Sequence, residues 1–230
     1  MSEMSLSVIV PVLNEAAGLA NTLRQARQPG VTEIIVVDGG SSDATLQVAN
    51  QLADLVLTAP KGRATQMNAG AKRARGDIFL FLHGDTLLPD GFADAVIDVC
   101  SLPHVIGGRF DLRLEPSSPL LRLTASLINL RSRLSRIATG DQAIFARRQA
   151  FVALGGFATI PLMEDIDFCR RMKRNGRIAC LRQQVVTSSR RWLDDGVVRT
   201  ILLMWSLRFL YFCGVAPETL KRAYSDARRR

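Results

Sequence analysis

The chain has 230 residues, of which 47% are hydrophobic and 22% charged, a balance that excludes intrinsic disorder and suits one domain with a well-buried core. Its formal net charge is +9, and only four of its 30 basic residues are lysine, so that 26 are arginine. The guanidinium group pairs with phosphates and carboxylates, so this composition suits a phosphorylated substrate, a nucleic acid or an anionic membrane surface.

Short apolar runs alternate with helical patterns through the first ninety residues. The runs are continuous and rich in valine and isoleucine, which is typical of parallel strands buried on both faces. In the first intervening helix Asn14 is the expected N-cap, and Leu19, Leu23 and Ala26 form the expected buried stripe. Strands are expected at 6–12, 32–38, 54–58 and 78–82, and helices at about 14–26, 44–52 and 63–75.

This alternation predicts an α/β fold with a Rossmann-like, mostly parallel central sheet, helices on both faces and right-handed crossovers. No repeat or low-complexity linker interrupts the chain, so we expect a single domain over residues 1–230. Within it we interpret residues 1–90 as a nucleotide-binding half and residues 91–230 as an acceptor and catalytic half.

The second half is less regular, and we expect it to contain a small antiparallel element. Segment 105–114 alternates like a strand with one exposed face. The helix that ends at Gly176 begins with three acids, Glu164, Asp165 and Asp167. Helices are expected at 89–100, 151–155, 165–175 and 200–215, strand pieces at 105–114, 139–146, 178–181 and 185–187, and a polar basic tail at 221–230.

Residues 120–137 predict a basic amphipathic helix. Leucines recur in it at helical spacing, with arginines between them. One interpretation is a helix that packs its leucines into the core and exposes its charges. The other is a lid, or a surface that faces the acceptor or a membrane. The apolar positions are Leu123, Leu127, Leu130, Leu134 and Ile137.

Three aspartates, Asp38, Asp43 and Asp85, stand at or just after predicted strand ends. Ligands of open α/β sheets bind at this edge, because the loops there converge on one crevice. Like charges in one crevice need a cation or a hydrogen-bonding ligand. Hard oxygen ligands suit Mg²⁺ or Mn²⁺, so we expect Asp85 to hold a metal-bound diphosphate.

A short loop with two cations, Lys61-Gly62-Arg63, precedes a predicted helix, where a phosphate can bind the helix N-terminus. The spacing of a Walker loop is absent, and no GxGxxG motif follows the first strand, so a nicotinamide cofactor is not expected. The two histidines, His83 and His104, stand in no serine or cysteine nucleophile motif.

The four cysteines are widely spaced, which argues against a zinc site or a disulfide framework and for a reducing compartment. The amino-terminal residues 1–7 do not resemble a signal peptide, and we expect a cytoplasmic protein. The apolar stretch 200–215 is interrupted by Arg208 and is shorter than the roughly 20 residues of a membrane span.

Several short segments of the chain form a further pattern. They are 10–15, 36–43, Lys61-Gly62-Arg63 with Asn68-Ala69-Gly70, His83-Gly84-Asp85, Met163-Glu164-Asp165 and Arg191-Trp192. In order and spacing these segments resemble the family 2 glycosyltransferases of GT-A fold over nearly the whole chain. The resemblance implies transfer of a sugar from a nucleotide diphosphate sugar to an acceptor hydroxyl, with inversion at the anomeric carbon.

The resemblance also implies roles for individual residues. Asp165 would be the general base, with Glu164 beside it, and Asp85 the ligand of Mn²⁺ or Mg²⁺. The donor would be bound by residues from five segments. These are Pro11, Asn14, Glu15, Asp38, Lys61, Arg63, Asn68, His83, Arg191 and Trp192. Glu15 and Asp38 would contact the ribose and base, and Arg191 with Trp192 would close over the diphosphate.

The chain departs from the family at His83, where an aspartate is usual, so that this strand end carries one carboxylate rather than two. A neutral imidazole can still bind Mn²⁺ or the ribose. Segments 161–165 and 188–192 further resemble a bacterial subgroup associated with arsenosugar biosynthesis, which implies a role in arsenosugar or other glycoconjugate synthesis.

Two alternatives stay open at this level. A nucleotidyltransferase also uses a metal-bound acid, but it would carry a glycine-rich basic loop where residues 14–17 stand. A basic module that binds nucleic acid or a membrane surface would gather its cations on one face with interleaved aromatics, which are only 6% here. We therefore expect no nucleic-acid partner. Peripheral membrane association is compatible with a transferase, and nothing in the sequence indicates the oligomeric state.

Overall fold

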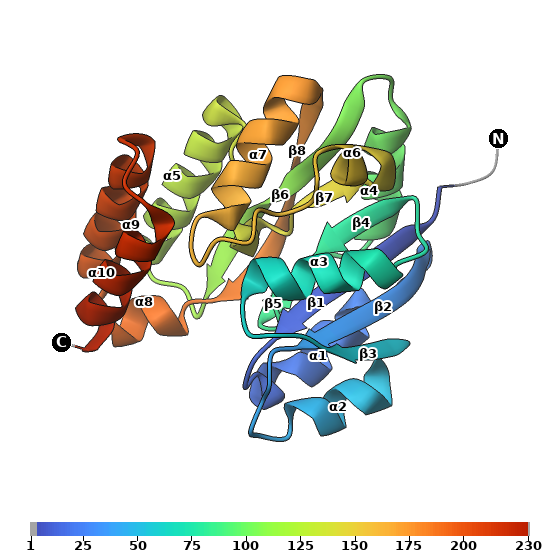
Figure 1. Cartoon of the computed structure of the whole chain (residues 1–230), viewed down its shortest axis with the longest axis horizontal. Coiled ribbons are helices and arrows are strands. Elements are labelled where there is room, and N and C mark those ends of the chain that lie inside the picture. Colours follow the sequence, from blue (N-terminus) through green and yellow to red (C-terminus); the bar gives the residue numbers. More distant parts are fainter. Residues whose placement is uncertain (1–3, 230) are drawn as a thin grey trace.

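The computed structural model describes residues 4–229, and its centre is one mixed β-sheet with helices on both faces (Figure 1). The strands are β1 (Leu6–Val12), β2 (Val31–Asp38), β3 (Leu55–Thr58), β4 (Ile78–Phe81), β5 (Thr86–Leu87), β6 (Val105–Glu115), β7 (Phe145–Arg147) and β8 (Arg177–Ser188). Their order across the sheet is β3-β2-β1-β4-β7-β6-β8-β5.

The helices connect these strands or cover the sheet. They are α1 (Ala16–Ala26), α2 (Thr45–Leu52), α3 (Arg63–Arg73), α4 (Phe92–Ser101), α5 (Pro119–Ser135), α6 (Arg148–Ala153), α7 (Glu164–Asn175), α8 (Arg190–Asp194), α9 (Val197–Phe212) and α10 (Pro217–Arg229). A short 3₁₀ helix, η1, spans Gly140–Gln142.

The parallel half of the sheet agrees with the sequence. Strand β1 pairs in parallel with β2 and β4, and β2 pairs in parallel with β3. The predicted stripe of Leu19, Leu23 and Ala26 on α1 is buried. The predicted N-cap was wrong, since Glu15 precedes α1 and Asn14 has a left-handed backbone with φ of 56°.

The second half joins this sheet through an antiparallel strand. Strand β7 lies between β4 and β6 and runs antiparallel to both, whereas β6 and β8 are parallel. The two strand pieces expected at 178–181 and 185–187 form the single strand β8, whose register shifts opposite Phe110 and Asp111. The prediction of a mostly parallel GT-A-type sheet with a small antiparallel element is confirmed.

Two expectations for the second half were wrong, and one short strand was missed. Strand β6 is buried on both faces for most of its length, because helices cover both sides of it. The two-residue strand β5, which pairs with β8, was too short to detect by pattern. The basic tail forms the helix α10, which packs along α9 and buries Leu220.

Two hydrophobic clusters hold the layers together, one on each face of the sheet. Helices α1, α2, α4 and α5 contribute to the first, with strand residues such as Val8 and Phe110. Helices α3, α6, α7, α9 and α10 contribute to the second, with strand residues such as Ile9 and Phe81. Over residues 4–229, no helix has both the length and the apolar character that crossing a bilayer requires.

Candidate active site

The loop after β2 is organised by Asp38, which is buried at the strand's end. Its carboxylate accepts hydrogen bonds from the backbone N–H of Gly40 at 2.8 Å and of Ser41 at 3.0 Å. The side chain of Asn14 in turn accepts from the N–H of Ser42 at 2.8 Å, which ties the loops after β1 and β2 together. These residues shape the carboxyl edge of the parallel strands.

Asp43 has a structural role at the same edge. Its carboxylate accepts from the N–H of Thr45 at 3.0 Å and of Ala16 at 3.2 Å, which joins the starts of α1 and α2. The hydroxyl of Thr45, followed by these N–H groups, holds the pKa of Asp43 below its ordinary value. A shared cation, one of the two explanations offered for the gathering of Asp38, Asp43 and Asp85, is not needed by the first two, because backbone N–H groups bond their carboxylates.

Asn68 has a different role from the one expected. Its amide donates to the carbonyl of Phe157 at 2.8 Å and accepts from the N–H of Phe157 at 3.0 Å. Both polar ends of the side chain are thus used to anchor the loop before α7. We correct its assignment from a donor contact to an anchor of the catalytic loop.

Gln66 joins the two central strand ends and was missed in the sequence. From α3 its amide donates to the carbonyls of Val12 at 2.9 Å and Val37 at 2.8 Å. Pro11 lies buried in β1 opposite Val37, so it shapes the same edge through the backbone. A glutamine inside a helical pattern gives no local signal of such a long-range contact.

Asp85 lies in an open cavity of about 310 Å³ at the carboxyl edge of the sheet. Glu15 lines the same cavity from the loop before α1, and Ser188 and Arg190 line it from the end of β8. The sequence placed Arg191 here, but its side chain lies outside the described residues. Trp192 is half-buried and packs against the first hydrophobic cluster. Among the described side chains, Arg190 is a cation that lines this cavity together with Asp85.

The donor set around Asp85 fits a metal ion bound mainly through its substrate. Among residues 4–229 no three histidine, cysteine or acidic side chains come together into a ready-made metal site. Mg²⁺ and Mn²⁺ are often bound by one or two carboxylates with substrate phosphates completing the shell. Asp85, with Glu15 in the same cavity, meets that lower requirement.

A second, small cavity contains the acids at the start of α7. His83, Gly140, Glu164 and Asp165 line it together with apolar side chains. The Asp165 carboxylate accepts from the N–H of Gly140 at 2.8 Å and of Ile166 at 2.7 Å. A Cβ on Gly140 would lie 2.7 Å from Nε2 of His83, so only glycine lets the 140 loop lie this close to the imidazole.

Glu164 is buried, and Asp165 beside it is half-buried in the same small cavity. Burial is the main cause that raises both pKa values, and repulsion from Asp165 adds to the rise for Glu164, to about 7. The position of Asp165 at a helix N-terminus favours its ionised form, and burial opposes it. The two N–H groups on Asp165 favour charge on that residue when the pair holds one proton.

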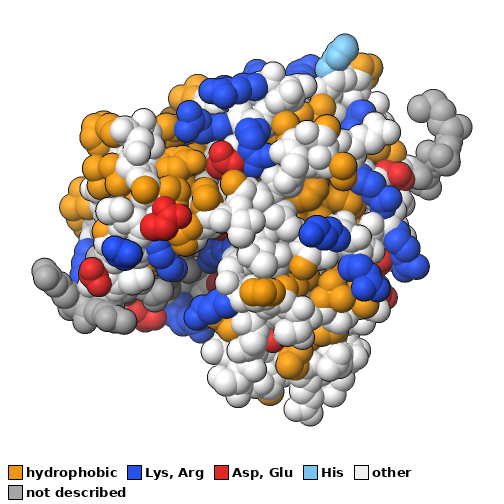
Figure 2. Space-filling model, in the orientation of Figure 1, with side chains coloured by type: hydrophobic (Ala, Val, Ile, Leu, Met, Phe, Trp, Pro, Cys, Tyr) orange, Lys and Arg blue, Asp and Glu red, His pale blue; other side chains and the backbone are white. Residues whose placement is uncertain are grey.

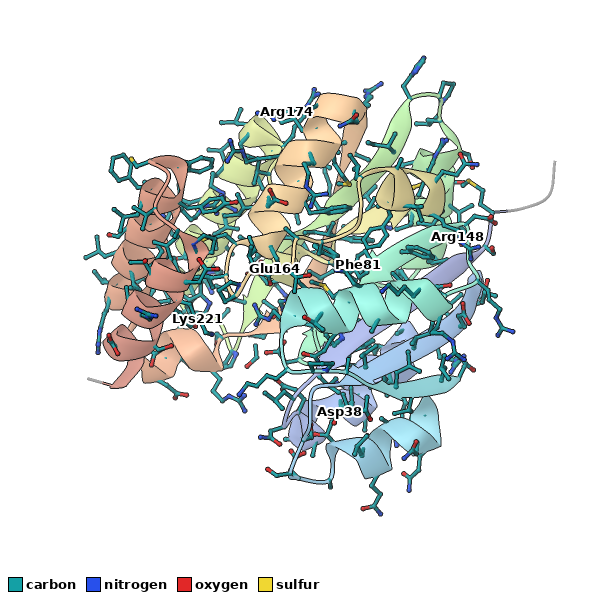
Figure 3. The ribbon with its side chains drawn as sticks, viewed as in Figure 1. Asp38, Phe81, Arg148, Glu164, Arg174 and Lys221 are labelled. Carbon is teal, nitrogen blue, oxygen red and sulfur yellow. The ribbon has the colours of Figure 1, made fainter. Side chains whose placement is uncertain are left out.

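Basic side chains from both halves act on this pair. The charge of Arg63, at the start of α3, opposes the rise in the pKa of both acids, and Lys221 of α10 does so for Glu164. Figure 3 shows Glu164 at the N-terminal end of α7, with Phe81 on one side and Lys221 on the other. Lys61 is exposed in the loop before α3. The catalytic acids and the phosphate-binding loop expected from the sequence therefore meet in space.

A Rossmann-like half, a mixed second half and an acid pair beside the strand-end histidine define a glycosyltransferase of GT-A type. Residues 7–153 match the family model described as "Glycosyl transferase family 2". The chain belongs to this family.

Relatives of known description agree with this assignment. A "PGL/p-HBAD biosynthesis glycosyltransferase" of Mycobacterium bovis is 32% identical over 203 residues, which cover 82% of this chain and 77% of the relative. A "Pre-mycofactocin glycosyltransferase" of Mycobacterium tuberculosis is 27% identical over 96% of this chain, and the match covers 48% of that protein.

Solved structures show the same fold. Residues 1–349 of TarS from S. aureus superpose with a TM-score of 0.64 at 21% identity, covering 86% of this chain and 64% of that one. The mannosyltransferase PcManGT from Pyrobaculum calidifontis, in complex with GDP-Man and Mn²⁺, gives a TM-score of 0.63 at 22% identity and covers 81% of this chain. The chain thus spans less than two thirds of the length of TarS 1–349, and 57% of PcManGT.

Proposed function

We propose that the protein is an inverting glycosyltransferase that moves a sugar from a nucleotide diphosphate sugar to an acceptor hydroxyl, with Asp165 as the general base. The observation that carries the proposal is the acid pair of buried Glu164 and half-buried Asp165, which lines one cavity with His83 just after strand β4. Asp85, two residues after His83, lines the larger cavity in which a diphosphate would bind.

In the proposed reaction Asp165 takes the proton of the acceptor hydroxyl, whose oxygen attacks the anomeric carbon as the bond to the diphosphate oxygen breaks. Attack on the face opposite the leaving group gives inversion. The N–H groups of Gly140 and Ile166 orient the carboxylate that receives the proton. Arg63 and Arg190 are the cations placed to balance the charge of the departing nucleoside diphosphate.

Asp85 would hold the Mn²⁺ or Mg²⁺ ion, with Glu15 as the second carboxylate in reach. When bound, such an ion neutralises charge on the diphosphate and orients it. His83 faces the catalytic acids rather than the larger cavity. We therefore assign His83 to the sugar side of the site.

The remaining details of the proposal concern the donor, the acceptor and the location. Glu15 and Asp38 are proposed at the ribose and base, Lys61 at a phosphate, and Trp192 beside the segment that covers it. Support for a glycoconjugate acceptor is twofold: segments 161–165 and 188–192 resemble the arsenosugar subgroup, and the Mycobacterium bovis relative is described as a "PGL/p-HBAD biosynthesis glycosyltransferase". Free cysteines suit the cytoplasm, where nucleotide sugars are made, and peripheral association with the inner membrane face is part of the proposal.

The experiment is the isosteric change Asp165→Asn. It should lower turnover about 10²–10⁴-fold, because the amide cannot take the proton, while donor affinity stays nearly constant. The assay measures nucleoside diphosphate released from a panel of UDP- and GDP-sugars in the presence of acceptor, and donor affinity by calorimetry.

Asp167→Asn is the matched control, since Asp167 lies on the same helical turn but forms a half-buried ion pair with Arg171. It should keep wild-type turnover. Equal loss in both variants, or loss of donor binding in Asp165→Asn, would contradict the role of Asp165 as base. Release of pyrophosphate from a nucleoside triphosphate and a sugar phosphate would instead favour a nucleotidyltransferase.

A further inference from the structure

Helix α5 exposes most of its leucines to solvent and buries polar side chains, which is the opposite of the usual arrangement in an amphipathic helix. Its leucine stripe points to solvent, with side chains between 43% and 77% exposed. The buried positions of the same helix include the polar residues Thr124 and Ser132. The exposed stripe consists of Leu120, Leu123, Leu127, Leu130 and Leu134.

This orientation is fixed by polar contacts with strand β6. Asn129 donates to the carbonyl of Leu112 at 2.9 Å and accepts from the N–H of Leu112 at 2.8 Å. Asp111 of β6 pairs with the buried Arg109 and with Arg133 of α5. Turning the leucines inward would leave these buried charges unpaired, which is costly. The exposed leucine stripe is thus a stable property of the fold.

Helix α9 carries a second exposed apolar stripe. Its members are between 51% and 67% exposed and repeat every three or four residues, so they share one face of the helix. The opposite face packs into the second hydrophobic cluster through Leu207. The exposed stripe consists of Val198, Leu202, Trp205, Phe209 and Phe212.

The two stripes lie at the same end of the molecule, and we call them together the α5–α9 apolar surface (Figure 1). Figure 2 shows hydrophobic side chains gathered at that end, with basic and a few acidic groups around them. The surface adjoins the catalytic helix, since the guanidinium of Arg170 on α7 lies 5.5 Å from the ring centre of Phe212.

The two helices of this surface contribute only basic charges. Neither α5 nor α9 contains an acidic residue within its bounds. Arg122 on α5 and Arg199 on α9 are exposed, and Arg208 is half-buried. Exposed aromatic and leucine side chains beside arginines, with a tryptophan among them, have the chemistry of helices that lie in the interface of an anionic bilayer.

We propose that the α5–α9 apolar surface docks the enzyme on the surface of an anionic lipid bilayer, with the stripes in the headgroup region and the arginines on lipid phosphates. A second copy of the chain fits less well, because neither α5 nor α9 contributes an acid that could meet the arginines of the other copy. This inference deepens the membrane association that the proposed function includes, but the docking surface is separate from the reaction site and can be tested without catalysis.

The test is cosedimentation of the full chain with vesicles of phosphatidylglycerol and phosphatidylcholine, and with vesicles of phosphatidylcholine alone. Wild type should bind the anionic vesicles, more weakly as salt is raised. The double variants Leu123→Gln with Leu127→Gln, and Trp205→Gln with Phe209→Gln, should each bind roughly tenfold more weakly or worse. Asp165→Asn should bind like wild type, which separates docking from catalysis.

Leu102→Gln with Val152→Gln is the matched control, since both side chains are exposed apolar residues outside the surface. It should keep wild-type binding. Brominated lipid should quench the tryptophan fluorescence of wild type strongly and that of Trp205→Phe much less. Because Trp205→Phe should still fold and bind, this difference reports insertion of Trp205 into the bilayer.

Equal binding by wild type and both surface variants would overturn the proposal, as would equal binding to neutral and anionic vesicles. Sedimentation that shows a dimer in wild type and monomers in the surface variants, without vesicle binding, would assign the surface to a second copy instead.

Discussion

Glu164 is buried beside Asp165, and its charged form is therefore disfavoured. Its pKa of about 7 in the folded protein compares with an ordinary value of 4.5. The folded state holds a proton between these values that the unfolded chain has lost, so the free energy of unfolding falls as pH rises through this window. The loss is complete above about pH 7 and amounts to at most about 3 kcal/mol.

We predict that Glu164→Gln abolishes this decrease in the free energy of unfolding with rising pH. The variant should be more stable than wild type at pH 8, by up to about 3 kcal/mol, and nearly equal to it at pH 5, since the amide carries no charge at either pH. Urea unfolding at both pH values measures the difference. Glu218→Gln, on the exposed first turn of α10, should show no such pH dependence. A Glu164→Gln variant that is less stable than wild type at pH 8 would contradict the raised pKa.

The sequence located the residues of the site better than their roles. Asp85, His83 and Asp165 could be placed because strand ends and helix starts have local patterns. Asn68 and Gln66 could not, because their partners are backbone groups 89 and 29 or more residues away in sequence. Hydrogen bonds of this kind depend on the packing of whole elements, which no local pattern encodes.

Helix α5 shows the same difference at the scale of an element. Its existence followed from leucine periodicity, but periodicity says which residues share a face and not which face is buried. The contacts that decide the orientation of α5 are those with Arg109 and Asp111 on β6. The same two residues are buried on a strand for which the alternating pattern suggested one exposed face. The choice between a core-packed and a surface-facing leucine stripe therefore depended on a contact between elements.

We predict that Asp111→Asn loosens α5 from the sheet. The change removes the charge that pairs with Arg109, which is 2% exposed, and with Arg133. Breaking a buried ion pair on one side costs about 3–5 kcal/mol, because the other charge stays buried. Urea unfolding measures the loss, and hydrogen exchange should rise first in α5.

Glu115→Gln on the same strand is the control for this change. Glu115 pairs with Arg113 at 3.3 Å, and both side chains are about half exposed. Its loss should cost less than about 1 kcal/mol, as for other surface pairs. Equal destabilisation by Asp111→Asn and Glu115→Gln would show that the buried network does not fix α5.

At the scale of the whole molecule, the parallel half was predictable and the strand order of the second half was not. Buried parallel strands are continuous apolar runs, and four of them in alternation with helices imply one sheet. The antiparallel insertion of β7 between β4 and β6 rests on contacts between residues such as Leu80 and Phe145, which are remote in sequence. It is this insertion that brings η1 and α7 to the end of β4 and so assembles the acids beside His83.

The site contains residues from both halves of the chain. Binding of the nucleoside diphosphate, the product that the donor releases, should therefore stabilise the whole folded molecule. We predict that UDP or GDP, with Mn²⁺ and at about 100 times its Kd, raises the free energy of unfolding by about 2.7 kcal/mol. For a chain of this size that corresponds to about 5–11 °C in melting temperature. Asp85→Ala should remove most of the shift, and chelation of the metal should do the same in wild type. Asp90→Ala, an exposed aspartate five residues further on, should keep it. If the melting temperature of Asp85→Ala rose as much as that of wild type, the metal and diphosphate would bind elsewhere. The rise depends on the affinity of the ligand, and removing a carboxylate that binds the metal should lower that affinity.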